Sequence, residues 1–336
     1  MALWDAVAGL EVEIDGYALR RRELQTERGW TRVTTTVELA GAGETGEGED
    51  VTYHEGDHDH VPGDLALAGR RSLEGLSRRL DELELWRGDP DDHTSQDHRR
   101  WAFESAAFDL ALRQAGVSLA EAVGREGRPV RFVASTRADI RPWLRLYPAM
   151  EFKLDVEEDW DRALMEQLAA LDRVRVVDLK AYYRGTSVDL APDLELYRAV
   201  AESFPGVVIE DPWLEGGCLE ALGRAKKRIS FDAPVHSLAD LDGLAIAPRW
   251  LNVKPSRFGT VHELLRTIDA CEERKIRMYG GGQFELVEAR PPEHRAELLA
   301  DATHPVRHRL EDVHSPGPSG AASGLCGSPG RAPPSL

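Results

Sequence analysis

Four segments between residues 174 and 256 decide the fold: VRVVDLK (174–180), GVVIEDP (206–212), RISFDAP (228–234) and WLNVKPS (250–256). Each is a short apolar run that ends in a charged side chain, which is typical of a buried strand reaching the edge of a sheet. The charged residues Asp178, Glu210, Asp232 and Lys254 recur at intervals of 32, 22 and 22 residues (178 to 210, 210 to 232, 232 to 254). One strand plus one helix fills such an interval, so the segments predict successive strands of one parallel sheet.

The same alternation continues on both sides of these segments. Further apolar runs are VRFVAS (130–135), MEFKLD (150–155) and IRMYGGG (276–282), and amphipathic stretches of helical period separate the runs. In a TIM-type (β/α)8 barrel the active site lies at the carboxyl ends of such strands. We therefore predict an α/β fold with a (β/α) barrel of seven clear strands over residues 126–314, and a weak eighth strand near 305–313.

The N-terminal third has a different texture. Residues 1 to about 60 alternate apolar and polar side chains, as in VTTTVELAG (33–41), and the glycines of GAGETGEGED (41–50) favour turns between antiparallel strands. Helical stretches follow at 73–86 and 99–116, and a polar loop lies between them at 88–99. Gly116 is a fitting C-terminal stop for the second helix. These signals predict an α+β domain over residues 1–125.

Composition narrows the class of protein. Of the 336 residues 42% are hydrophobic, which is enough for a large core, and the formal net charge is −17. So acidic a chain disfavours nucleic acid and anionic membranes as partners. The three cysteines are far apart, and the N-terminus lacks the pattern of a secretion signal. We expect a cytoplasmic protein whose Pro-, Gly- and Ser-rich tail, residues 315–336, is disordered.

The charged strand ends indicate a metal site. Asp178, Glu210 and Asp232 would converge at one edge of the sheet, where three carboxylates stay ionised together only beside a cation. Carboxylate oxygens suit Mg²⁺ or Mn²⁺ better than zinc. Because side chains two apart on a strand share a face, Lys153 with Asp155, and Asp178 with Lys180, should also face the site.

These motifs together resemble the enolase superfamily, in particular its muconate-lactonizing-enzyme and o-succinylbenzoate-synthase members. The resemblance covers about residues 10–290. FKLD lies at the family's Lys-x-Lys motif, VVDLK at Asp-x-Asn, IEDP at Glu-Asp/Gln-Pro, FDAP at Asp-Glu and NVKPSRFG at Lys-Pro-Ser-Arg-x-Gly. GETGEGED is similar to a turn of the family's capping domain, and GGGQFE to its seventh-strand segment that touches the substrate.

The resemblance implies an N-terminal capping domain, a Mg²⁺ cofactor, a small carboxylate substrate and a homo-oligomer. It also implies removal of the proton α to the carboxylate through an enediolate. We expect catalytic roles for Lys153, Lys180 and Lys254, and substrate contacts from Asp155, Gln283 and Glu285. Asp178, Glu210 and Asp232 would bind the metal.

Three positions depart from the family pattern. The second lysine of Lys-x-Lys is Asp155, the Asn of Asp-x-Asn is Lys180, and Ala233 follows Asp232 in place of Glu. Lys180 is therefore open to three interpretations: a base moved from one strand to the next, a cation paired with an acid, or a cation that weakens or replaces the metal. With one standard base missing, we favour a lyase, dehydratase or cycloisomerase. The alternatives are a racemase or epimerase, and a catalytically impaired metal- and ligand-binding barrel.

Overall fold

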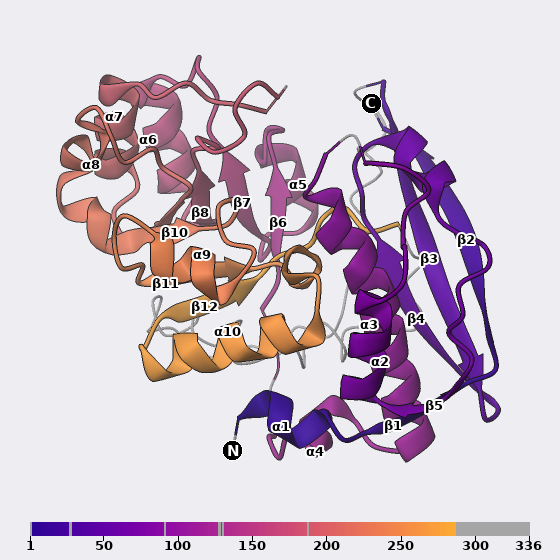
Figure 1. Cartoon of the computed structure of the whole chain (residues 1–336). Coiled ribbons are helices and arrows are strands. Elements are labelled where there is room, and N and C mark those ends of the chain that lie inside the picture. The colour runs from indigo at the N-terminus through magenta and orange to yellow at the C-terminus, as the bar shows by residue number, and fades with distance from the viewer. Residues whose placement is uncertain are drawn as a thin grey trace.

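The computed structural model describes residues 2–286 except 27–28, 91, 127–128, 130 and 187. It places an N-terminal α+β part beside a curled parallel sheet (Figure 1). The weak eighth strand predicted near 305–313 and the tail at 315–336 lie outside the described residues.

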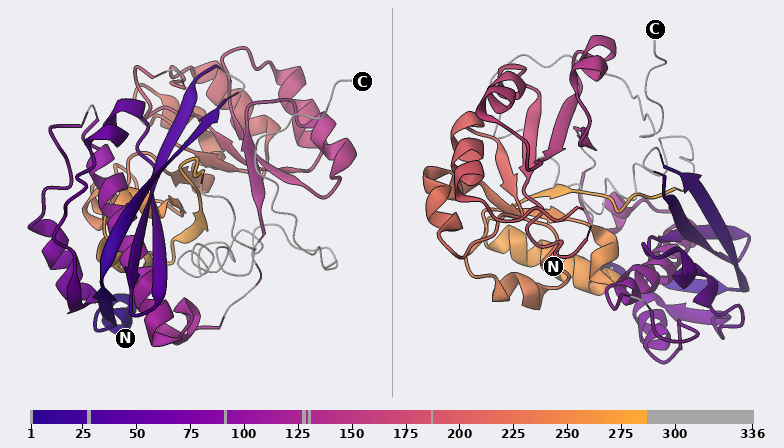
Figure 2. Two further views of the ribbon diagram at one scale, coloured as in Figure 1. Left: turned by 90° about the vertical axis from the view of Figure 1, so that its right-hand side faces the viewer. Right: turned by 90° about the horizontal axis from the view of Figure 1, so that it is seen from above.

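The parallel sheet has its seven strands in chain order, each hydrogen-bonded to the next. Figure 2 shows how the sheet curls, with the succeeding helices on its outside. The α/β barrel prediction is confirmed, since each strand falls on a predicted apolar run. The strands are β6 (Val133–Thr136), β7 (Glu151–Asp155), β8 (Val174–Asp178), β9 (Val208–Glu210), β10 (Ile229–Phe231), β11 (Trp250–Val253) and β12 (Arg277–Gly280).

Helices connect these strands, and several begin at a side chain that accepts a hydrogen bond from the first turn. Asp161, Asp193, Ser237 and Thr260 cap α6, α7, α9 and α10 in this way. The connecting helices are α5 (Arg141–Leu146), α6 (Arg162–Ala170), α7 (Leu194–Ser203), α8 (Cys218–Ala221), η2 (Gly223–Arg228), α9 (Leu238–Gly243), η3 (Pro255–Phe258) and α10 (Val261–Glu273).

The N-terminal part contains a three-stranded antiparallel sheet, β2-β3-β4, and a two-stranded one, β1-β5. This confirms the predicted antiparallel strands. Its elements are α1 (Leu3–Val7), β1 (Glu11–Ile14), β2 (Gly16–Gln25), β3 (Thr31–Gly41), β4 (Glu44–Asp50), η1 (Glu55–His60), β5 (Gly69–Ser72), α2 (Leu73–Asp81), α3 (Ser95–Ala115) and α4 (Leu119–Ala122).

The glycine-rich segment was predicted wrongly in one respect. Residues 44–50 form strand β4, and the turn is confined to Ala42 and Gly43. The other glycines serve packing, because a Cβ at Gly46 would lie 2.2 Å from Ala106 O and one at Gly48 would lie 2.0 Å from Ala102 O. They let the backbone of α3 lie directly on β4.

Helix α3 joins the two parts of the molecule. It begins at Ser95, within the predicted polar loop, and ends at Ala115, where the predicted stop Gly116 forms the C-cap with a left-handed φ of 67°. It packs against β4 on one side and against η3 and α10 on the other (Figure 1). Its Glu104 Oε2 accepts a hydrogen bond of 3.0 Å from Val261 N at the start of α10. No helix within the described residues is long and apolar enough to span a membrane.

Candidate metal centre and active site

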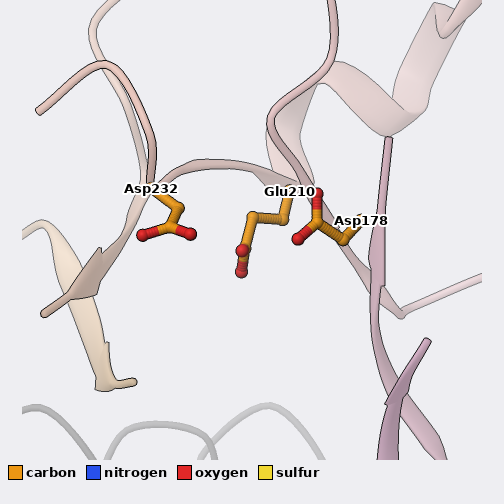
Figure 3. Close-up of side chains that lie close together, drawn as sticks. All are labelled: Asp178, Glu210 and Asp232. Atoms are coloured by element: carbon orange, nitrogen blue, oxygen red, sulfur yellow. The ribbon is translucent and has the colours of Figure 1, made fainter. Parts of the chain in front are cut away.

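Three carboxylates meet at the carboxyl ends of neighbouring strands. Asp178 and Glu210 are the last residues of β8 and β9 and lie side by side in register, and Asp232 follows β10 directly. One oxygen from each lies within 4.8 Å of the others, and all three residues are fully buried. Figure 3 shows the three side chains directed toward a common space. The structure therefore brings together the three carboxylates that the sequence predicts to converge.

The chemistry of this cluster fits a bound cation. Burial raises the pKa of Glu210 to about 8, and the negative charges of Asp178 and Asp232 add to the shift against the opposing effect of Lys153. Asp232 Oδ1 is buried without a hydrogen-bond partner among the described residues. Crowded anionic oxygens with unused lone pairs suit a hard divalent ion, so the cluster could hold a metal.

Lys153 and Lys254 flank the carboxylates on opposite sides. Lys153 Nζ contacts Glu210 and lies 2.8 Å from Asp178 Oδ2, whereas Lys254 Nζ lies 2.8 Å from Asp232 Oδ2. Burial by itself lowers the pKa of Lys153. The carboxylates of Asp178 and Glu210 have the larger effect, so the pKa of Lys153 is raised. Burial lowers the pKa of Lys254, and the charge of nearby Arg257 adds to that effect against the pull of Asp232. The two lysines therefore differ in how readily they release a proton.

Lys180 and Asp155, two of the three residues that depart from the family pattern, lie together. Lys180 Nζ lies 2.5 Å from Asp178 Oδ2 and 3.4 Å from Asp155 Oδ1. Asp155 Oδ2 in turn accepts a hydrogen bond of 3.0 Å from Arg137 Nε. Burial by itself lowers the pKa of Lys180. The negative charge of Asp178 opposes that effect, and the pKa of Lys180 is raised. Lys180 is thus a paired cation in this structure.

Gln283 reaches the site, and Glu285 supports it from behind. Gln283 Oε1 lies 3.4 Å from Lys254 Nζ and 3.3 Å from the hydroxyl of Tyr53, which belongs to the N-terminal part. Glu285 Oε1 accepts a hydrogen bond of 2.8 Å from Gln283 N. Arg32, fully buried, donates to the backbone oxygens of Gln283 and Phe284 and so fixes this turn against β3.

Several site residues escaped the sequence reasoning. The hydroxyl of Tyr279 donates to Glu210 and lies 3.0 Å from Ser230 Oγ, and Asn252 Nδ2 lies 3.3 Å from both oxygens of Glu210. Tyr279 and Asn252 are partners in register between β12 and β11. The signal that could have found Asn252 is its two-residue spacing from Lys254, which places both on the same face. Tyr279 depends on the register that sets it beside Asn252.

Asp211 was also missed as a supporting residue. Its two carboxylate oxygens accept hydrogen bonds from Asp232 N at 2.7 Å and Ala233 N at 2.9 Å. The residue adopts a positive φ of 48°. It therefore holds the chain that carries Asp232 in place.

Comparison with known proteins agrees with this architecture. The N-terminal domain model of DUF8230, a domain of unknown function, matches residues 5–122, and its C-terminal domain model matches residues 126–309. The chain is 27% identical over 198 residues to o-succinylbenzoate synthase from Enterococcus faecalis, a match that covers 55% of this chain and 52% of that protein. The match therefore spans about half the length of that curated relative.

Solved structures show the same fold. A dipeptide epimerase from Methylococcus capsulatus complexed with Mg ion has a TM-score of 0.63 at 21% identity, covering 87% of this chain and 86% of its own. Muconate lactonizing enzyme from Pseudomonas putida has a TM-score of 0.57 at 19% identity, with 81% of each chain covered. An enolase-superfamily member from Listeria innocua has a TM-score of 0.56 at 16% identity, covering 90% of this chain and 84% of its own. The predicted resemblance is confirmed.

Proposed function

The chain belongs to the DUF8230 family and has the fold of the enolase superfamily, and from its candidate site we propose that it is a Mg²⁺-dependent enzyme that removes the proton α to a carboxylate. The observation that carries the proposal is the cluster of Asp178, Glu210 and Asp232 with the buried amine of Lys254 beside it. An all-carboxylate ligand set favours Mg²⁺. The bound ion would supply a Lewis acid that stabilises negative charge.

The charges of the site support a substrate that becomes a dianion. The described groups in mutual contact are five acids and five bases, so their formal charges cancel. A divalent ion would leave +2, and a carboxylate that loses its α-proton to become an enediolate carries −2. The acids are Asp155, Asp178, Glu210, Asp211 and Asp232, and the bases are Arg137, Lys153, Lys180, Lys254 and Arg257.

Lys254 is the base in this proposal. Its pKa is lowered by burial and by the neighbouring Arg257, and a lysine must be deprotonated to accept a proton. Gln283 Oε1 lies 3.4 Å from its Nζ and would orient the amine. Lys153, whose pKa is raised, would remain an ammonium and balance negative charge on the substrate carboxylate. Tyr53 and Gln283 would contact the substrate from the cap side.

The reaction that fits a single base is a lyase, dehydratase or cycloisomerase reaction. Epimerisation requires proton transfer on both faces, and the position opposite Lys254 in the family pattern holds Asp155, which is paired with Arg137 and Lys180. A second candidate function is a barrel that binds metal and ligand without turnover. Two features favour it: the pairing of Asp155 with Arg137 and Lys180, and Ala233 at the position where the family pattern has Glu.

Proton exchange in deuterated water tests the proposal. Dipeptides, acid sugars and succinylbenzoate-like acids are incubated with the full chain and Mg²⁺, and α-deuterium is measured by mass spectrometry. For an acid that exchanges, Lys254→Ala should slow exchange by about 10²-fold or more. Lys180→Ala should keep most of it, and the exposed Lys227→Ala serves as the control. Equal exchange by wild type and Lys254→Ala would remove Lys254 as the base, and loss of exchange in Lys180→Ala would assign that role to Lys180.

An acid that exchanges without loss of its configuration supports the one-base reaction. Racemised product would favour the epimerase. Ligand binding with no exchange of any acid would favour the barrel without turnover.

A further inference from the structure

Lys180 contacts both carboxylate oxygens of Asp178, one of the three candidate metal ligands. Its backbone N–H donates to Asp178 Oδ1 at 3.0 Å, and its ammonium lies 2.5 Å from Asp178 Oδ2. The backbone contact depends on an unusual conformation, since Lys180 adopts a left-handed φ of 49°. A lysine rarely adopts this conformation, so the surrounding structure holds it there.

Lys180 is a built-in part of the site. Only 8% of the residue is exposed, and Nζ lies 4.9 Å from the centroid of the Tyr183 ring. Asp155, anchored by Arg137, offers a second carboxylate 3.4 Å from the ammonium. The ammonium therefore has two acidic partners, of which one is a candidate metal ligand and the other is not.

From this geometry we propose that Lys180 is an internal counter-ion that competes with the divalent metal for Asp178 and so sets the metal affinity of the site. A positive charge this close to a ligand oxygen repels an incoming cation strongly in a buried site. Asp155 lessens the competition, because it can receive the ammonium when Asp178 turns to the metal. The inference rests on the proposed metal-dependent function and adds a determinant of metal affinity to it.

The inference predicts opposite effects at two neighbouring positions. Lys180→Gln removes the charge but keeps hydrogen-bonding ability toward Asp178, and it should tighten Mg²⁺ binding on the order of 10-fold or more. Asp155→Asn leaves the ammonium without its second carboxylate and should weaken Mg²⁺ binding severalfold. Lys227→Gln, which removes the same charge from an exposed position on η2, is the matched control and should leave the affinity within about twofold, as for a screened surface charge.

Isothermal titration of the metal-free full chain with Mg²⁺ measures these affinities, and circular dichroism checks that each variant is folded. If Lys180→Gln does not fold, Lys180→Met, which keeps the side-chain length, takes its place. The rise in melting temperature on Mg²⁺ addition gives a second measure, and it should be larger in the Lys180 variant than in wild type.

The outcomes separate the inference from the proposed function. Tighter Mg²⁺ binding by Lys180→Gln, with the affinity of Lys227→Gln unchanged, supports the inference. The inference is equally supported if Lys180→Gln binds Mg²⁺ measurably and wild type binds it too weakly to measure. Equal or weaker binding by Lys180→Gln, with wild type binding Mg²⁺, overturns the inference and leaves the metal-dependent function standing. Absence of Mg²⁺ binding in both wild type and Lys180→Gln overturns both.

Discussion

Gly281 follows β12 directly, at a point where an added methyl group would displace the candidate base. A Cβ on Gly281 would lie 2.6 Å from Asn252 Oδ1 and 3.1 Å from Lys254 Cε, whereas ordinary contacts begin at 3.4 Å. In Gly281→Ala the Asn252 oxygen must therefore move by about 0.8 Å and Lys254 Cε by about 0.3 Å, if each retreats to ordinary contact distance. Both side chains are buried, so neither can turn freely away.

The displacement should reduce both turnover and stability. A misplacement of about 1 Å at a reacting group costs about 10²-fold in rate, so a shift of about 0.3 Å at Lys254 Cε should lower kcat by roughly 4-fold. The melting temperature should also fall, because the methyl group overpacks two buried side chains at a cost of about 1–3 kcal/mol. The assay is Mg²⁺-dependent α-proton exchange, followed at saturating substrate.

Gly56→Ala is the matched control, since a Cβ there has no atom within 4 Å and the residue is exposed. The control should exchange protons at the wild-type rate. If Gly281→Ala exchanges protons as fast as Gly56→Ala, the amine of Lys254 does not need its position beside Asn252 and Gly281. The reasoning that a displaced Lys254 slows proton exchange would then be refuted.

Three further predictions concern the supports of the site. Asp50→Asn breaks a buried ion pair with Arg99, 2.8 Å between Oδ2 and Nε, and should destabilise the protein by about 3–5 kcal/mol in chemical denaturation. Burial would raise the pKa of Asp50, but Arg99 outweighs it and lowers the pKa below 3.8. The stabilisation is therefore complete above pH 3.8 and is lost as the pH falls through the lowered value, a loss that Asp50→Asn should not show. Tyr279→Phe removes a donor to Glu210 and should weaken Mg²⁺ binding by about 10-fold in titration calorimetry, whereas Tyr197→Phe, a buried tyrosine bonded to Trp213 N, should not. Gly48→Ala forces α3 away from β4 and should lower the free energy of unfolding by about 1–3 kcal/mol; an unchanged denaturation midpoint would contradict the close packing of α3 on β4.

The strand ends were predictable because they combine two strong signals, an apolar run and a terminal charge at a fixed interval. The convergence of Asp178, Glu210 and Asp232 could therefore be predicted from the sequence alone. Lys153 and Asp155 followed from the alternation of side chains along β7. Lys180 was predicted by the same rule, but it lies beyond the end of β8 with a positive φ, so the alternation is not the reason that it faces the site. These inferences use local periodicity and the geometry common to all parallel barrels.

Tertiary contacts explain what the sequence did not predict. Gly46 and Gly48 have the local preferences of a turn, but the close approach of α3 makes them strand residues. Helix α3 begins at Ser95, among polar residues that by themselves favour a loop. In the folded protein His98 and Arg99 are buried in the first turn and a half of the helix. The partners of Lys180 and Tyr279 depend on the register between strands, which the apolar runs alone do not specify.

Metal binding and proton exchange, measured together in the variant Glu210→Gln, test whether the carboxylate cluster holds the ion that the reaction needs. The substitution keeps the shape of the side chain and removes one of the three carboxylates. We predict that wild type binds Mg²⁺ and exchanges the α-proton of a carboxylic acid, that chelation stops the exchange, and that Glu210→Gln loses binding and exchange together. Exchange that continues at the wild-type rate in the chelated protein or in Glu210→Gln would contradict a metal-dependent reaction at this site.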